Sequence, residues 1–207
     1  MRMTEWITVV DRNRNKLGVK SRDAIHQDGD WHETFQCWFI EQVMGVYYIH
    51  LQLRSEEKKD FPSLYDITAA GHLLMDETPA DGIREIKEEL GIELKYEDLH
   101  FLDAVPNTIQ LPGFIDNEIS LVYVYEIQKN LRYQFLDAEV QGVIRVELSQ
   151  FEQLISKERN AIPLERYIDE SYVQGGEHLT MRKIVPHEQI YFEKVLSKIN
   201  DYIKELS

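Results

Sequence analysis

Three glutamates near the middle of the chain have a spacing that suits a metal site. Glu85, Glu88 and Glu89 stand at positions i, i+3 and i+4, so on an α-helix their carboxylates share one face. Like charges at this spacing repel, whereas a hard cation such as Mg²⁺ needs several oxygen ligands at about 2.0–2.1 Å. The spacing therefore predicts a helix that holds Mg²⁺, with Mn²⁺ as the other candidate ion. The competing interpretation is a solvated helix with a crowded acidic face.

The residues around the glutamates predict where this helix begins and ends. Thr78 suits the N-cap, Pro79 suits the first helical position, and Asp81 completes a capping-box-like pair with Thr78. Gly91 stands where a left-handed residue usually ends a helix. The apolar face opposite the carboxylates is formed by Ile83, Ile86 and Leu90.

The stretch from Gly71 to Ile92 resembles the signature of the Nudix hydrolases: a Gly, then a Glu, then Arg-Glu-apolar-x-Glu-Glu-x-Gly-apolar. The second half is matched at every fixed position, by Arg84, Glu85, Ile86, Glu88, Glu89, Gly91 and Ile92. The resemblance implies that Glu85, Glu88 and Glu89 are metal ligands. It implies structural roles at the site for Gly71, Glu77, Arg84 and Gly91.

The first half of the signature departs from the family pattern by one residue. Six residues, not seven, separate Glu77 from Arg84. Glu77 could keep its role across a one-residue deletion, or Asp76 could take the acidic position with Ala70 in place of the glycine. We favour Glu77, since Gly71 continues a second pattern. Arg84 can then pair with Glu88, four residues on, or reach back to Glu77.

That second pattern runs from Leu53 to His72 and resembles the region before the signature in isopentenyl-diphosphate isomerases and their Nudix relatives. The resemblance implies that Arg54 and Lys58 bind the substrate diphosphate, for which guanidinium and ammonium groups are suited. The alternative is a mixed-charge surface loop. Three histidines also resemble the metal ligands of the isomerases, although their spacing differs slightly: His26, His32 and His72. Structural or surface roles for them are the alternative.

One position argues against isomerase activity. The isomerase reaction needs a cysteine immediately before Gly-His, and this chain has Ala70 there. The only cysteine, Cys37, lies in a predicted core strand. We therefore interpret the isomerase resemblance as shared ancestry and shape.

A downstream acidic loop supplies the last candidates. Asp116 and Glu118 follow the Pro112-Gly113 turn and enter a predicted strand. In many Nudix enzymes a glutamate from such a loop contacts metal or acts as a base, so the resemblance implies that Glu118 or Glu85 takes a proton from the attacking water. By the same analogy the Ala70 carbonyl is a further metal ligand.

Composition limits the classes of partner. The 207 residues include 23 basic and 37 acidic side chains, a net charge of −14. Such acidity argues against nucleic-acid or membrane-surface binding, because phosphates would be repelled. One cysteine excludes an intramolecular disulfide, and neither a signal sequence nor a long apolar run is evident. We expect a cytoplasmic protein with a small phosphorylated substrate.

The periodicities predict an α/β fold, a Nudix-type α/β/α sandwich with a mixed sheet and an added C-terminal helix. Strands are expected at 5–11, 16–20, 35–41, 46–53, 65–70, 99–105, 118–127 and 143–148, with a short helix at 149–155. The predicted Nudix domain covers residues 1–158. Residues 159–207 form a helical extension, with an amphipathic helix over 187–206 that packs on the same domain or, alternatively, forms a homodimer contact.

The predicted function is Mg²⁺-dependent hydrolysis, of pyrophosphohydrolase type, of a phosphoanhydride bond in a nucleoside diphosphate derivative or nucleoside triphosphate. A nucleotide-sensing module without turnover and a prenyl-diphosphate isomerase are the alternatives. Such modules usually lose signature carboxylates, and none is missing here. The aromatic residues that could stack on a base, or equally form core, are Trp31, Trp38, Tyr47 and Tyr48.

Overall fold

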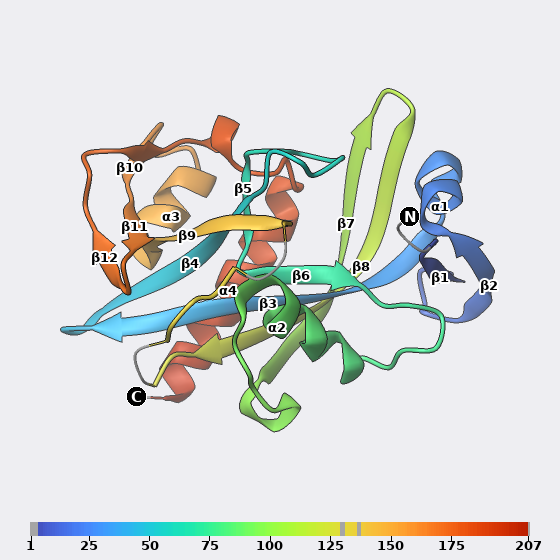
Figure 1. The fold of residues 1–207 in the computed structure, drawn as a ribbon, viewed down its shortest axis with the longest axis horizontal. Helices are drawn as coiled ribbons and strands as arrows, with labels where there is room; N and C mark the ends of the chain where they lie inside the picture. The colour runs from blue at the N-terminus through green and yellow to red at the C-terminus, as the bar shows by residue number, and fades with distance from the viewer. Residues whose placement is uncertain (1–3, 129–130, 136–137, 207) are drawn as a thin grey trace.

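One large mixed β-sheet organises the chain in the computed structural model, which describes residues 4–128, 131–135 and 138–206 (Figure 1). Its strands are β1 (Trp6–Val10), β2 (Lys16–Ser21), β3 (Trp31–Val43), β4 (Val46–Arg54), β5 (Tyr65–Ile67), β6 (Ala69–His72), β7 (His100–Leu111), β8 (Phe114–Glu126), β9 (Val140–Glu147), β11 (Glu165–Ile168) and β12 (Ser171–Val173). Strands β10 (Ile162–Pro163) and β13 (His178–Leu179) form a separate pair.

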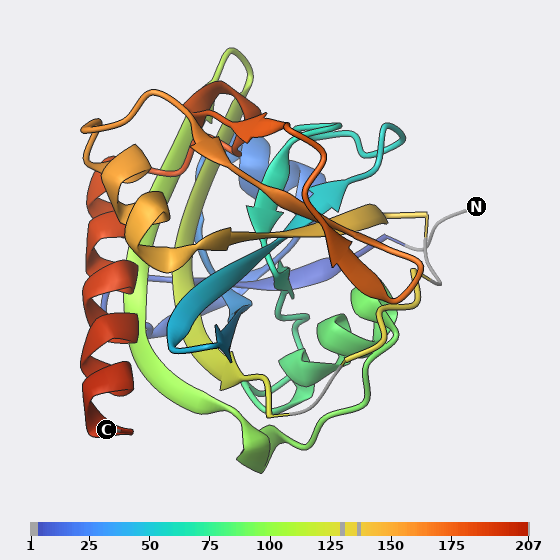
Figure 2. The ribbon, with the colours of Figure 1, turned by 90° about the vertical axis from the view of Figure 1, so that its left-hand side faces the viewer.

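The helices cover both faces of this sheet. They are α1 (Arg22–Asp28), α2 (Arg84–Leu90), α3 (Leu148–Ile155) and α4 (Gln189–Glu205), with short 3₁₀ turns η1 (Asp81–Ile83), η2 (Tyr96–Asp98) and η3 (Met181–Lys183). Figure 2 shows α3 and α4 on one side of the curved sheet and α2 on the other. This arrangement confirms the predicted α/β/α sandwich and its C-terminal helix.

Strand β3 connects the parts of the sheet. It pairs antiparallel with β4 and β6 and parallel with β8, where Trp31 lies opposite Asn117 and Ile40 opposite Glu126. Long antiparallel pairings then join β7 to β8 and β4 to β9. The sheet is therefore mixed, as predicted.

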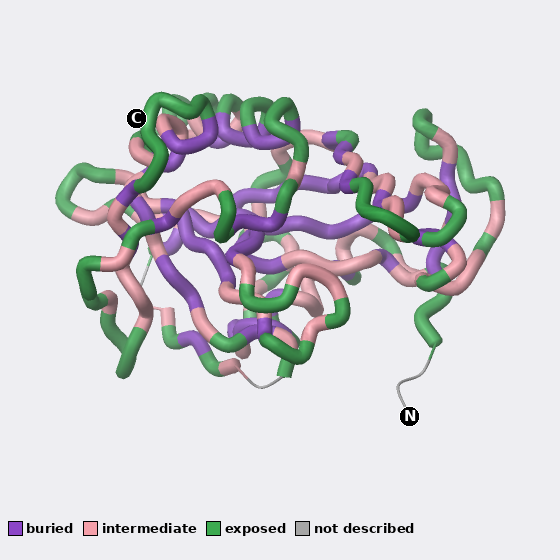
Figure 3. The backbone as a smooth tube through the Cα atoms, turned by 90° about the horizontal axis from the view of Figure 1, so that it is seen from above, coloured by how far each residue is buried: buried purple, intermediate pink, exposed green. Residues whose placement is uncertain are grey.

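Side chains that alternate along β3 and β8 create two cores. Phe35, Cys37 and Phe39 pack with Ile86 and Leu90 of α2. The intervening Trp38 and Ile40 join the core that is covered by α3 and α4, whose buried residues include Phe151, Leu154, Phe192, Val195 and Ile199. Figure 3 shows α4 with a buried inner face and an exposed outer face. The C-terminal helix thus packs on the sheet within this chain.

The predicted strand over 65–70 is in fact two strands. Its first part, β5, pairs with β4, and its second part, β6, pairs with β3. Thr68 lies between them, where its hydroxyl donates to the His50 carbonyl at 2.5 Å and accepts from the Phe39 amide at 3.0 Å. These side-chain bonds replace ladder bonds and let the chain cross from one partner strand to the other.

The signature helix begins later than predicted. The Asp81 carboxylate accepts from the Thr78 amide at 2.8 Å and from its hydroxyl at 2.7 Å, so the predicted pair forms. It closes a turn outside the helix, however, and a 3₁₀ turn follows before the α-helical residues start at Arg84. Gly91 ends the helix in the left-handed region with φ 68°, as predicted.

Several elements lacked a periodic signal. Helix α1 and the short strands between 162 and 179 were not predicted, and β7 is longer than expected. Strand β11 pairs with β9, so the chain after 158 contributes to the main sheet before it forms α4. The domain boundary at 158 stays a prediction. No helix of the described residues is long and apolar enough to cross a membrane.

Candidate active site

A cleft of about 730 Å³ opens beside α2 and β6. Nearly all of the predicted site residues line it: Arg54, Lys58, Gly71, Arg84, Glu85, Glu88, Glu89 and Glu118. We call it the acidic cleft. Glu77 and Gly91 support α2 from outside the lining.

The three carboxylates of α2 differ in their exposure. The Glu88 side chain is 54 % exposed, that of Glu85 is 12 % exposed, and Glu89 is buried. Glu89 Oε2 accepts hydrogen bonds from Gln52 Nε2 and from the Ala70 amide, both at 3.0 Å. The three carboxylates therefore range from buried, at Glu89, to half exposed, at Glu88.

Gly71 lets β6 approach the helix closely. A Cβ atom at this position would lie 2.0 Å from Glu85 Oε1, a distance that no packed side chain tolerates. Any other residue at position 71 would therefore displace the Glu85 carboxylate, so glycine preserves the position of that group beside β6.

Burial and mutual repulsion disfavour the ionised forms of two of these acids. Burial first, and then the charge of Glu89, raise the pKa of Glu85 well above its ordinary value. Burial raises the pKa of Glu89 to about 7, although the charge of Lys58 and the Ala70 hydrogen bond act in the opposite direction. A bound cation would relieve both costs.

Arg84 braces the helix against the preceding loop. Its Nε and Nη2 donate to the Glu77 carboxylate at 2.5 and 3.0 Å, and Nη2 also donates to the His72 carbonyl at 3.1 Å. Its Nη1 lies 2.7 Å from Glu85 Oε1 and 3.0 Å from Glu88 Oε2. Both proposed partners of Arg84 therefore contact it, and Glu77 is also fixed by the Leu74 amide at 2.9 Å.

Arg54 and Lys58 also line the acidic cleft, and both already have protein partners. Arg54 donates to Asp66 Oδ2 at 2.9 Å and to the carbonyls of Asp60 and Phe61 at 2.9 and 3.2 Å. Lys58 pairs with Glu139. These contacts join the loop after β4 to β5 and to the segment before β9.

Glu118 projects into the acidic cleft from β8. It accepts from Gln36 Nε2 at 3.1 Å and lies 3.5 Å from the Ser120 hydroxyl. Burial raises the pKa of Glu118 well above its ordinary value, and the charges of Asp116 and Asp66 add to the effect. The donors that contact Glu118 are neutral, unlike the arginine beside Glu85.

The three histidines come together in space, and Asp116 completes the cluster. The potential ligand atoms of His26, His32, His72 and Asp116 all lie within 4.8 Å of one another. The Nε2 atoms of His26 and His32 each lie 3.4 Å from Asp116 Oδ1. These atoms and His72 Nε2 are buried, and none makes a well-aligned hydrogen bond to the residues that the structure describes. Burial lowers the pKa values of His32 and His72. Three imidazole nitrogens grouped with one carboxylate are a donor set for a divalent transition metal.

Sequence reasoning missed several residues of the acidic cleft. Asp66 is a carboxylate inside a short apolar strand, which was a readable signal, whereas His187 comes from the distant C-terminal segment. Phe61 and Phe114 also line the acidic cleft, with ring centroids 6.1 Å apart.

The aromatic residues nominated for stacking lie elsewhere. Trp38 is in the core, Arg12 covers the ring of Trp31, and Arg145 covers that of Tyr48. Neither these residues nor Tyr47 belong to the described lining of the acidic cleft.

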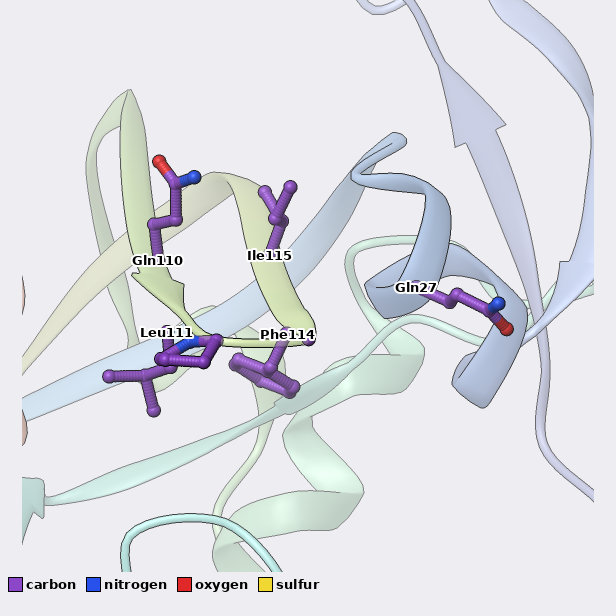
Figure 4. Close-up of a pocket in the computed structure, with 7 residues that line it drawn as sticks. Gln27, Gln110, Leu111, Phe114 and Ile115 are labelled. Carbon is purple, nitrogen blue, oxygen red and sulfur yellow. The ribbon is translucent and has the colours of Figure 1, made fainter.

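A smaller pocket of about 430 Å³ lies at the tip of the β7–β8 hairpin (Figure 4). Its described lining consists of Gln27 and residues 110–115, none of which is ionisable. Phe114 borders both pockets. This pocket offers no group that would bind a metal or a phosphate by charge, so we assign the chemistry to the acidic cleft.

Comparison with known proteins agrees with this architecture. The family model described as the NUDIX domain matches residues 22–169. An uncharacterised Nudix hydrolase of Clostridium acetobutylicum is 28% identical over 204 residues, which cover 95% of this chain and 98% of that protein. An isopentenyl-diphosphate Delta-isomerase of Paenarthrobacter aurescens is 30% identical over 129 residues, 61% of this chain and 68% of the isomerase. A crystal structure of a Deinococcus radiodurans protein shares the fold, with a TM-score of 0.53, 17% identity, and coverage of 74% of this chain and 88% of that one.

Proposed function

The chain belongs to the Nudix family, and from that premise we propose that it is a metal-dependent hydrolase. Its substrate is a nucleoside diphosphate derivative or a nucleoside triphosphate, and the bond cleaved is a phosphoanhydride. One observation carries the proposal: the complete acid set of α2 lines the same cleft as Arg54 and Lys58. Such a cleft suits a diphosphate that binds with its counter-cations.

The residues present fit a hard divalent cation. Glu85, Glu88 and Glu89 supply only oxygen ligands. The raised pKa values of Glu85 and Glu89 show that the nearby positive charges of Arg84, Lys58 and Arg54 do not fully offset the burial of these carboxylates. Mg²⁺ or Mn²⁺ held there would neutralise phosphate charge and activate water for attack at phosphorus. The His26, His32, His72 and Asp116 cluster is a proposed second site for a transition metal ion, by resemblance to the isomerases and by its unsatisfied nitrogens.

Other side chains of the acidic cleft are assigned to phosphate binding, to proton transfer and to the support of the helix. Arg54 and Lys58 hold the phosphates and stabilise charge that develops on them. Glu118 takes the proton from water, because its contacts are with neutral donors and its raised pKa makes it a stronger base once ionised. Glu85 is the alternative base, but Arg84 lies 2.7 Å from it. Arg84 and Glu77 keep the helix in place.

The organic part of the substrate is assigned to the aromatic edge of the acidic cleft. Phe61 comes from the loop after β4, a few residues after Arg54 and Lys58, and Phe114 from the β7–β8 hairpin. A planar or apolar group that extends from the diphosphate would stack on these rings. This assignment replaces the stacking residues predicted from the sequence.

Isomerisation of a prenyl diphosphate is the second candidate, because of the histidine cluster and the similarity to an isomerase. Ala70 occupies the position of the required cysteine, and Cys37 is fully buried in the core on the α2 side. Neither residue can exchange a proton with a substrate carbon. A sensing module without turnover would not need the complete set of acids.

The test is a panel of nucleotides and prenyl diphosphates, incubated with Mg²⁺ or Mn²⁺ and scored for phosphate products. We expect at least one nucleotide to be cleaved, with loss of activity in EDTA and in Glu88→Gln. That side chain is half exposed, so the variant should fold normally. Glu93→Gln, which changes a glutamate just after the helix that is 77 % exposed, is the control. Binding without turnover, or an allylic isomer as the product, would refute the proposal.

We also propose a cytoplasmic location and a homodimer, neither of which the catalytic function depends on. The dimer would need a surface other than the inner face of α4, which packs in the core of the same chain. Light scattering on the purified protein would decide the oligomeric state.

A further inference from the structure

Two chains of hydrogen bonds join the C-terminal segment to the acidic cleft. They start at His187 and Tyr191, which lie beyond residue 169, where the family match ends. Both side chains are almost fully buried: His187 is 6 % exposed and Tyr191 is inaccessible. One chain leads to Arg54 and the other leads to Glu118.

The first chain has only one consistent arrangement of protons. The backbone amide of Glu188 can only donate, and it donates to Asn107 Oδ1 at 3.1 Å. The Asn107 amide nitrogen therefore faces His187 Nδ1, at 2.9 Å, and donates to it. His187 must then carry its proton on Nε2, which donates to Asp66 Oδ1 at 2.9 Å.

This arrangement excludes His187 as a general base and gives it another role. Both of its ring nitrogens are occupied by protein partners. Asp66 also accepts from the Ile67 amide at 2.9 Å on Oδ1 and from Arg54 on Oδ2. Burial would raise the pKa of Asp66, but the hydrogen bond from His187 and the charge of Arg54 act in the opposite direction and hold the pKa below its ordinary value. Asp66 is thus a fixed, ionised anchor for the guanidinium.

Arg54 keeps donors for a ligand despite this anchor. Its Nε, one N–H of Nη1 and one N–H of Nη2 are bonded to Phe61, Asp66 and Asp60. The other N–H of each Nη atom makes no hydrogen bond to the residues that the structure describes. Arg54 lines the acidic cleft, so these two donors are available to a phosphate.

The second chain orients an amide beside Glu118. The Tyr191 hydroxyl donates to Gln36 Oε1, which leaves Gln36 Nε2 to donate to Glu118 Oε2 at 3.1 Å. Gln36 is buried, and a reversed amide would direct its oxygen at the Glu118 carboxylate. While Glu118 is ionised it needs the Nε2 donor of Gln36, and the Tyr191 hydroxyl supports this orientation by donating to Gln36 Oε1.

We propose that His187 and Tyr191 are positioning residues of the acidic cleft: His187 holds Arg54 through Asp66, and Tyr191 holds Glu118 through Gln36. The inference rests on the proposed hydrolase function and extends the site into the C-terminal segment. It predicts different kinetic effects for the two residues, since Arg54 binds substrate whereas Glu118 acts on water.

The His187 variants test the substrate-binding arm. For the nucleotide that the wild type cleaves, His187→Ala should raise KM about tenfold with little change in kcat, because Arg54 loses its fixed orientation. His187→Gln offers an acceptor and a donor in similar positions and should restore KM. His100→Ala removes an exposed histidine that contacts Tyr202 of α4, 4.7 Å between ring centroids, and is the control. An unchanged KM in folded His187→Ala would overturn this arm.

The Tyr191 variants test the catalytic arm. Tyr191→Phe should lower kcat about tenfold with KM unchanged, and Gln36→Met should do the same. The double variant should lose no more than either single one, because both interrupt one chain. Tyr202→Phe is the control on the same helix. Additive losses, or equal effects on KM and kcat, would overturn the positioning role of Tyr191.

A measurement on the unmodified protein keeps the inference testable if a variant fails to fold. Nitrogen NMR of ¹⁵N-histidine-labelled protein should show His187 neutral and protonated on Nε2. A proton on Nδ1, or a doubly protonated ring at neutral pH, would contradict the first chain whatever the kinetics. If the wild type cleaves nothing in the panel, the proposed function fails and the positioning roles fail with it. Turnover with variants that match the wild type would remove the inference alone.

Discussion

Replacement of Glu89 by glutamine should stabilise the metal-free protein at alkaline pH. Glu89 is buried, and its Oε2 accepts from Gln52 Nε2 and the Ala70 amide, both at 3.0 Å. A glutamine oxygen can accept the same two bonds. The substitution therefore removes an ionisable group from a buried, repulsive cluster without removing its hydrogen bonds.

The magnitude follows from the pKa of Glu89, which burial raises from the ordinary value of 4.5 to about 7. Between these values the folded protein retains a proton that the unfolded chain releases, so the free energy of unfolding falls as the pH rises through this window. At 1.36 kcal/mol per pKa unit, the loss is about 3 kcal/mol at pH 8. Glu89→Gln does not titrate and should escape this loss.

Urea unfolding in EDTA at pH 4 and pH 8 measures the effect. Glu89→Gln should match the wild type at pH 4 and exceed its free energy of unfolding by about 3 kcal/mol at pH 8. Added Mg²⁺ should narrow the gap, because it would bind the wild type better. Glu93→Gln, which changes a glutamate that is 77 % exposed, should behave like the wild type. A variant that is less stable than the wild type at pH 8 would refute the argument that Glu89 is a destabilised carboxylate.

Three further predictions concern other walls of the acidic cleft. Lys58→Ala should raise KM for the nucleotide substrate about tenfold in steady-state assays, whereas Lys87→Ala, on the exposed side of α2, should not. Asp66→Asn should lower the free energy of unfolding by about 1–2 kcal/mol at pH 7, because the folded-state pKa of Asp66 lies below the ordinary 3.8. That difference should shrink in urea titrations as the pH falls from 4 toward 2, and a constant difference would contradict it. Phe61→Ala should weaken binding of the nucleotide about tenfold in calorimetry but leave binding of inorganic diphosphate unchanged; equal losses for both ligands would remove Phe61 from the organic subsite.

The parts of the site that depend on short sequence separations could be predicted from the sequence. Helical periodicity places Glu85, Glu88 and Glu89 on one face, and the glycine at the end of α2 adopts the expected left-handed conformation. The choice of Glu77 over Asp76 rested on Gly71, which continues the second pattern, and the structure pairs Glu77 with Arg84.

The parts that depend on tertiary pairing could not be predicted in this way. His187 contacts Asp66 across 121 positions, and Tyr191 contacts Gln36 across 155. No local pattern identifies such partners, because the contacts arise only when α4 packs on the sheet. The histidine cluster could be predicted in part. Its three histidines were identified by resemblance, whereas their grouping with Asp116 depends on the pairing of β3 with β8.

The most direct test of the central claim is to run the reaction in water labelled with ¹⁸O and to analyse the products by mass spectrometry and phosphorus NMR. Attack of water at phosphorus in the acidic cleft predicts one labelled oxygen in one of the two phosphate-containing products, and only when Mg²⁺ or Mn²⁺ is present. A label on carbon, or an intact diphosphate with a rearranged organic group, would contradict the assignment of this protein as a phosphoanhydride hydrolase.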